Sequence, residues 1–70
     1  MIDLSRKIKT AAAHAAITEA EIARKTGTTP QNFSKRVKTG KFKAEELEAI
    51  AEAMGAEVVI EFRFPDGFTV

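Results

Sequence analysis

The chain has 70 residues, of which 44% are hydrophobic, and its 11 Lys and Arg residues nearly balance its 10 Asp and Glu residues, for a formal net charge of +1. This length suits one small domain, and the lack of cysteine excludes disulfides and thiolate metal sites. With one His and neither Trp nor Tyr, the chain shows no set of catalytic side chains, so we expect no enzyme, no cofactor and no metal site.

The charged side chains are distributed unevenly along the chain. Seven basic residues and no acid lie between Ile22 and Ala44, whereas the rest of the chain holds four bases and all ten acids. A segregated basic surface on a nearly neutral protein is typical of binding to the phosphate backbone of nucleic acids. The alternative is a solvated face that has no partner.

The first helix is expected over residues 3–16. Apolar residues at helical spacing predict its buried face: Leu4, Ile8, Ala12 and Ala15. The charges between them do not fit a signal peptide, and no apolar run is long enough to span a membrane, so we expect a cytoplasmic protein. His14, the single histidine, is expected to have a structural or solvated role.

A short second helix is predicted from Thr18 to Thr26. Thr18 and Glu21 have the spacing of a capping box, in which each side chain accepts a hydrogen bond from the other residue's backbone N–H. Gly27 is expected to end the helix, because glycine adopts the left-handed conformation without a steric penalty.

The third helix is predicted over residues 30–38. Thr29 suits its N-cap, and Pro30 suits the first helical position, where a missing N–H costs nothing. Phe33 and Val37 are four residues apart and should face the core. The polar side chains expected on or beside the opposite face are Gln31, Asn32, Ser34, Lys35 and Lys38.

The fourth helix is predicted from Ala44 to Met54, where Gly55 ends it, and its first turn lacks a good N-cap residue. Its apolar stripe consists of Leu47, Ile50, Ala51 and Met54. Its acidic outer stripe consists of Glu45, Glu48 and Glu52. We interpret this stripe as a solvated face rather than an acid–base or metal site, because no pocket-forming partner accompanies it.

After Gly55 the hydrophobic period changes to two, which predicts a strand followed by a turn at residues 65–67 and a short return over residues 68–70. The apolar face of this strand consists of Val58, Ile60, Phe62 and Phe64. An isolated hairpin is marginally stable and has open edges, so we expect it to pair with the same strand of a second copy. The alternative is that the strand packs back on its own helices.

The segment ITEAEIARKTGTTPQNFSKRVKTGK, residues 17–41, resembles the helix-turn-helix of the lambda-repressor-like (Cro-type, XRE) DNA-binding family. The matching positions are Thr18 and Thr29 as caps, Ile22, Ala23 and Phe33 in the core, and Gly27 in the turn. The likeness extends over residues 17–57, but Glu19 stands where many relatives have a glutamine that touches a phosphate. A strand also replaces the family's last helix, as in the shorter Cro-like members that dimerise through C-terminal strands.

This resemblance implies a mainly α fold, with a four-helix lambda-repressor-like domain over residues 1–56 and a C-terminal β-strand or hairpin for dimerisation over residues 57–70. It implies a transcriptional regulator, expected to be a repressor, that binds a palindromic operator in double-stranded DNA as a homodimer. Helix 30–38 would lie in the major groove. We expect no membrane association and no small-molecule ligand.

Gln31 is the first choice for reading bases, because its amide can pair bidentately with adenine, and Lys35 can donate to guanine one turn later. Asn32 and Ser34 are secondary candidates for base contacts. Phosphate contacts are predicted for Thr28, Thr29, Arg36, Lys38, Lys41 and Lys43.

A competing interpretation is an antitoxin or adaptor module, in which the C-terminal strand binds a different protein. Sedimentation of the isolated protein separates the two, because a stable homodimer favours the regulator and a monomer favours the adaptor.

Overall fold

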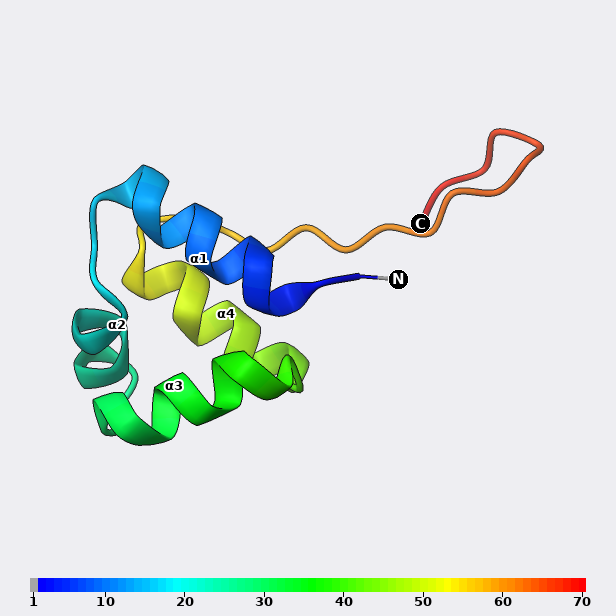
Figure 1. Ribbon diagram of the computed structural model, residues 1–70. Helices are drawn as coiled ribbons and strands as arrows, with labels where there is room; N and C mark the ends of the chain where they lie inside the picture. The colour runs from blue at the N-terminus through cyan, green and yellow to red at the C-terminus, as the bar shows by residue number, and fades with distance from the viewer. Residues whose placement is uncertain (1) are drawn as a thin grey trace.

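A computed structural model describes residues 2–70, which contain the helices α1 (Leu4–Ala15), α2 (Glu19–Lys25), α3 (Pro30–Thr39) and α4 (Ala44–Ala53). The predicted mainly helical fold is therefore confirmed. The helices form one body, and the chain after α4 runs away from it as an extended segment (Figure 1). None of the described helices has both the length and the apolar character needed to cross a membrane.

Three helices begin at a side chain that accepts a hydrogen bond from the backbone N–H three residues later. These side chains are Asp3, Thr18 and Thr29, at distances of 3.0, 3.1 and 3.2 Å. Within the described chain only the threonine half of the predicted capping box in α2 forms, and the Glu21 carboxylate instead lies 3.9 Å from Arg24. Each cap satisfies a backbone donor that the helix itself leaves unpaired, which explains where these helices start.

At the start of α4 the capping hydrogen bond runs from the backbone of the N-cap residue to a side chain inside the helix. Lys43 occupies the N-cap position, and its backbone N–H donates to Glu46 Oε1 at 2.8 Å. This is the glutamate half of a capping box, so α4 begins well without an accepting N-cap side chain.

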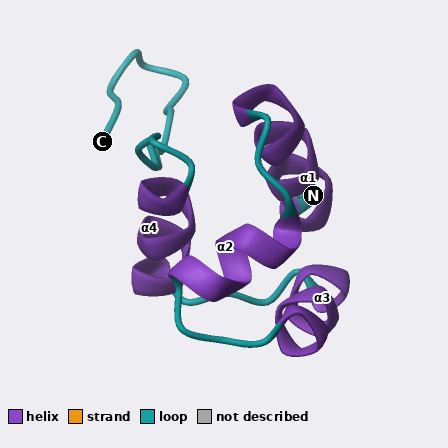
Figure 2. Ribbon diagram, turned by 90° about the vertical axis from the view of Figure 1, so that its left-hand side faces the viewer, coloured by secondary structure: helices purple, strands orange, loops and turns teal. Residues whose placement is uncertain are grey.

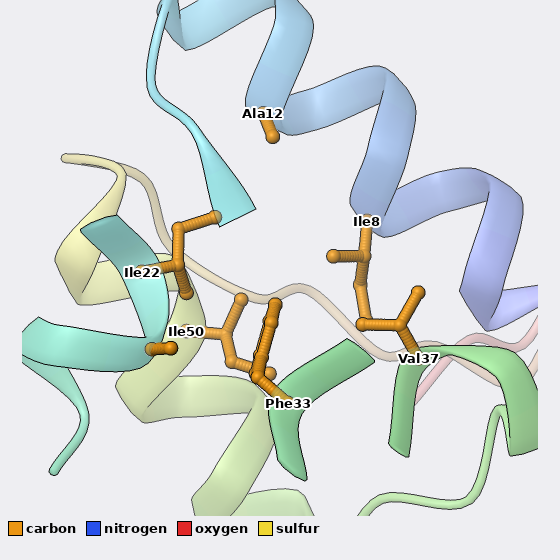
Figure 3. Packing of buried hydrophobic residues seen from close by; sticks show 7 residues of the cluster. Ile8, Ala12, Ile22, Phe33, Val37 and Ile50 are labelled. Carbon is orange, nitrogen blue, oxygen red and sulfur yellow. The ribbon is translucent and has the colours of Figure 1, made fainter. Parts of the chain in front are cut away.

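The core lies where the four helices meet, and Figure 3 shows its side chains pointing toward one another. Its buried residues are Ile8, Ala12, Ile22, Ala23, Phe33, Val37, Ile50 and Ala51, all of them predicted. Ala23 has no exposed surface, and its small side chain lets α2 and α3 approach closely. Phe42 and Met54 are half-buried at the margin and pack against this cluster.

The turn between α2 and α3 has the predicted conformation. Gly27 has a φ of +80°, in the left-handed region that glycine adopts most readily. The backbone N–H of Thr28 then donates to the carbonyl oxygen of Ala23 at 2.9 Å, which closes the end of α2. This short connection leads directly to the Thr29 cap of α3.

The end of α1 differs from the prediction. Ala15 is exposed rather than buried, and Ala16 leaves the helix with a φ of +55°. Ala12 in the last turn of α1 is buried, whereas Ala15 faces an open hollow between α1 and the end of α4, so the helical period alone does not bury it.

The predicted C-terminal strand is wrong for the single chain, because residues 57–70, here called the arm, contain no strand in the described structure. One antiparallel bridge joins Arg63 to Thr69, and Phe62 and Val70 exchange backbone hydrogen bonds of 2.6 and 3.0 Å. The short return supplies no neighbour for residues 57–61, which run extended and cannot form a ladder alone. The predicted turn does form, because Gly67 has a φ of +94°.

Candidate nucleic-acid interface

The buried side of α3 determines which side of this helix faces solvent. Phe33 and Val37 are 3% and 1% exposed, and they fix α3 against α1 and α2. Figures 1 and 2 show α3 along one edge of the helical body, so the side opposite these two residues faces solvent. The amphipathic pattern of α3 therefore determines which polar side chains are presented.

The four candidate base-reading residues all lie on α3. Gln31, Asn32 and Lys35 are exposed, and Ser34 is half-buried. Gln31 and Lys35 are four residues apart in a continuous helix, so they lie on the same face about one turn apart. The amide and the ammonium group can therefore approach one surface together.

The candidate phosphate-binding residues surround this face. Thr29, Arg36, Lys38, Lys41 and Lys43 are exposed, whereas Thr28 is half-buried in the turn. The Thr29 oxygen already accepts the Asn32 N–H, but a hydroxyl keeps its own proton to donate.

Two basic residues of the acid-free window, Arg24 and Lys25, were not among the predicted contacts. Lys25 is exposed in the last turn of α2, just before the Gly27 turn that leads into α3. Lys25 lies in the acid-free window between Ile22 and Ala44, and this position could have identified it as a candidate phosphate contact.

Most of the basic residues in that window keep their charge unpaired. Arg24 lies 3.9 Å from Glu21, and Arg36 forms an ion pair with Glu46. Within residues 2–70, no carboxylate lies within ion-pair distance of the other five, namely Lys25, Lys35, Lys38, Lys41 and Lys43. These ammonium groups therefore give the surface around α3 a net positive potential that an anionic partner would neutralise.

Arg36 is bound to its own protein in a way the sequence did not indicate. Its guanidinium lies 5.6 Å from the centre of the Phe42 ring and pairs with Glu46 on α4. The contact connects α3 with α4 through residues ten positions apart in the sequence. Because Glu46 compensates its charge, Arg36 is less available to a phosphate than the lysines.

Glu46 connects the start of α4 to this ion pair. The backbone N–H of Lys43 and, after it, the positive charge of Arg36 lower the pKa of the Glu46 carboxyl below its usual value. Both groups stabilise the ionised form, so the folded state holds its proton less tightly than the unfolded chain.

Glu46→Gln should lower the melting temperature near pH 7, because the amide retains the shape but loses the charge that faces Arg36. The folded-state pKa is the lower one, so this contribution is complete above the ordinary glutamate pKa and disappears as the pH falls through the lowered value. The melting temperatures of the two proteins should therefore converge as the pH falls below the lowered pKa of Glu46. Thermal unfolding followed by circular dichroism measures this, with exposed Glu48→Gln as the control.

The remaining candidate groups are solvated. Glu45, Glu48 and Glu52 are exposed on the outer side of α4, and His14 is exposed on α1. In the described part of the chain, no cluster of three or more His, Asp or Glu side chains is arranged to hold a metal ion.

Two capped helices are thus joined at Gly27, and the second of them has an exposed polar face. The sequence matches no protein-family model, and it gives no match to a curated protein or to a solved structure.

Proposed function

We propose that the protein is a sequence-specific DNA-binding transcriptional regulator that places α3 in the major groove of double-stranded DNA. One observation carries the proposal: the outer face of α3 presents Gln31 and Lys35 to solvent beside lysines that have no carboxylate partner among residues 2–70. The major groove is wide enough for an α-helix, and its base edges offer the acceptors and donors that these groups need.

Base reading is assigned to the first two turns of α3. Gln31 pairs through its amide with the N6 and N7 positions of adenine, and Lys35 donates to O6 or N7 of guanine. Asn32 and Ser34 lie beside them and can make further contacts with base edges. These contacts distinguish one sequence from another, whereas contacts with phosphates set the position of the protein on the duplex.

Phosphate binding is assigned to the two ends of α3. Thr29 and the helix start can hold a phosphate, because unpaired backbone N–H groups and the helix dipole favour an anion there. Lys38, Lys41 and Lys43 follow at the other end, and Thr28 and Lys25 lie before the helix. Arg36 contributes mainly by holding α3 against α4.

Lys41→Ala should weaken binding to all DNA sequences by a similar factor. Each lysine that neutralises a phosphate releases condensed counterions, so the slope of log K against log salt should become shallower by about one per half-site. Fluorescence anisotropy at several salt concentrations measures this slope. Lys9→Ala removes an exposed charge of the same kind from α1 and should leave the slope unchanged. An unchanged slope for Lys41→Ala would remove Lys41 from the interface.

The proposal includes a homodimer that forms through the arm. The apolar side chains that we assign to dimerisation are exposed in the single chain: Val58, Ile60, Phe62 and Phe64, at 37%, 65%, 68% and 51%. Contiguous exposed apolar surface favours association. A two-fold dimer would place two copies of α3 about 34 Å apart, so that they read two half-sites of a palindrome.

Selection of bound sequences from a random pool of duplex DNA tests the function. We expect enrichment of an imperfect palindrome whose half-sites are about one helical turn apart. A protein that enriches no sequence, under conditions where it is folded, does not have the proposed function.

The exposed apolar arm also supports a second candidate, an antitoxin or adaptor that binds a different protein. Sedimentation of the pure protein distinguishes them. A stable homodimer favours the regulator, whereas a monomer at concentrations well above those that saturate DNA favours the adaptor.

A further inference from the structure

An open groove of about 1210 Å³ lies between α1 and the end of α4, and we call it the α1–α4 groove. Small and apolar residues from both sides line it: Ala11, Ala15, Met54 and Ala56. Arg6, Lys7 and His14 add polar and basic groups to the same groove. The exposed Ala15, which helical periodicity placed on a buried face, is part of this surface.

The arm begins at one end of this groove and then leaves it. Ala56 lines the groove, Val58 and Ile60 border a separate hollow beside α4, and the rest of the arm extends away from the body (Figure 1). Phe62 and Phe64 are therefore 68% and 51% exposed. One chain thus has an apolar groove and an apolar arm that do not cover each other.

We propose that the α1–α4 groove of one copy receives the arm of a second copy, in a reciprocal exchange about a two-fold axis. The inference rests on the homodimer proposed above and identifies the surface that the arm occupies. A two-fold dimer contains each contact twice, so one arrangement covers both grooves and both sets of arm side chains.

The charges of the two surfaces are complementary. The arm carries three acids, Glu57, Glu61 and Asp66, and one base, Arg63, which pairs with Glu61 at 3.3 Å. The groove is lined by two bases, Arg6 and Lys7, and one acid, Asp3. An acidic apolar segment and a mainly basic apolar groove attract each other and disfavour groove-to-groove or arm-to-arm contact.

The small side chains of α1 make room for large ones. Ala11 and Ala15 are four residues apart and lie on the same face of α1. At these two positions only small side chains project into the groove. A phenylalanine ring can lie directly on this surface and bury apolar area on both sides. Direct pairing of two arms, by contrast, would leave the groove and Ala15 uncovered.

Filling the groove tests its role. Ala11→Arg should raise the dimer dissociation constant by at least about tenfold in sedimentation velocity, which corresponds to about 1.4 kcal/mol. Ala13→Arg places the same side chain on an exposed position of α1 outside the groove lining, and should leave the constant within about twofold. Far-UV circular dichroism establishes that both variants remain helical. Equal constants for the two variants would overturn the proposal.

Cross-linking tests the contact without adding bulk. The described chain has no free cysteine, so a single cysteine in each of two separate chains reports only contacts between molecules. Ala11→Cys is mixed in turn with Ile60→Cys, Phe62→Cys and Phe64→Cys, and disulfides are counted by intact mass. At one or more arm positions, the yield of the groove–arm disulfide should exceed the yield expected from random pairing of the two variants. It should also exceed the yield obtained when Ala13→Cys replaces Ala11→Cys. Mainly arm–arm disulfides, or equal yields for Ala11→Cys and Ala13→Cys, would overturn the proposal.

These experiments contain no DNA, so their failure is separate from failure of the DNA-binding proposal. A protein that selects a DNA sequence but shows arm–arm disulfides keeps its proposed function and loses the groove contact. A dimer with the groove–arm disulfide that selects no DNA sequence keeps the contact and loses the function.

Discussion

Replacing Phe33 with alanine should remove a large share of the protein's free energy of unfolding. Phe33 is 3% exposed at the junction of the helices, and truncating a buried phenylalanine costs about 3–5 kcal/mol. Folded proteins have a stability of only about 0.05–0.15 kcal/mol per residue, so a domain of 70 residues has little to spare. Far-UV circular dichroism against temperature and urea measures the loss.

Asn32→Ala is the matched control for this prediction. It shortens the exposed neighbour of Phe33 on the same helix, and it should change the free energy of unfolding by no more than about 0.5 kcal/mol. Phe33→Leu should recover much of the stability, because it refills most of the cavity. If Phe33→Ala were as stable as the natural protein, the core described above would be wrong.

Replacing Gln31 with alanine should remove the preference for one base pair in each half-site. A good bidentate contact contributes about 1–3 kcal/mol of discrimination, so two half-sites together contribute about 2–6 kcal/mol when their effects add. The loss should appear in the affinity for the selected operator and not in the affinity for random DNA. The fold should be unaffected, because Gln31 is exposed.

Competition binding with single-base-pair variants of the selected operator measures this effect. Gln31→Ala should bind all four variants at one position almost equally, whereas Lys41→Ala should weaken all of them and preserve their order. The two variants therefore act as controls for each other. If Gln31→Ala lowered the affinity for every sequence by one factor, Gln31 would contact the backbone and not a base.

Much of the helical body could be predicted from the sequence, because the interactions that form a helix connect residues close together in the chain. The caps at Thr18 and Thr29 and the turn at Gly27 depend on groups within a few residues. The inward position of Phe33 and Val37 also follows from a period of 3.6 residues. The exposure of Gln31 and Lys35 on the opposite side of α3 then follows from the same geometry.

Other features depend on which segments meet in space. The pairing of Arg36 with Glu46 joins α3 to α4, and no local pattern indicates it. Ala15 lies on an apolar face by its spacing, but it is exposed because it lines the open groove between α1 and the end of α4.

The arm shows most clearly which features follow from the sequence alone and which depend on the tertiary structure. Alternating apolar residues over 58–64 correctly indicated an extended backbone, because alternation is a property of the residues themselves. A strand also needs a second backbone beside it, and residues 57–61 have none in the single chain. The sequence by itself thus determined the helices, their caps and the polar face of α3 through short-range contacts. Only the tertiary structure decided that Arg36 pairs with Glu46 and which apolar surfaces stay uncovered, because both depend on how separate elements pack together.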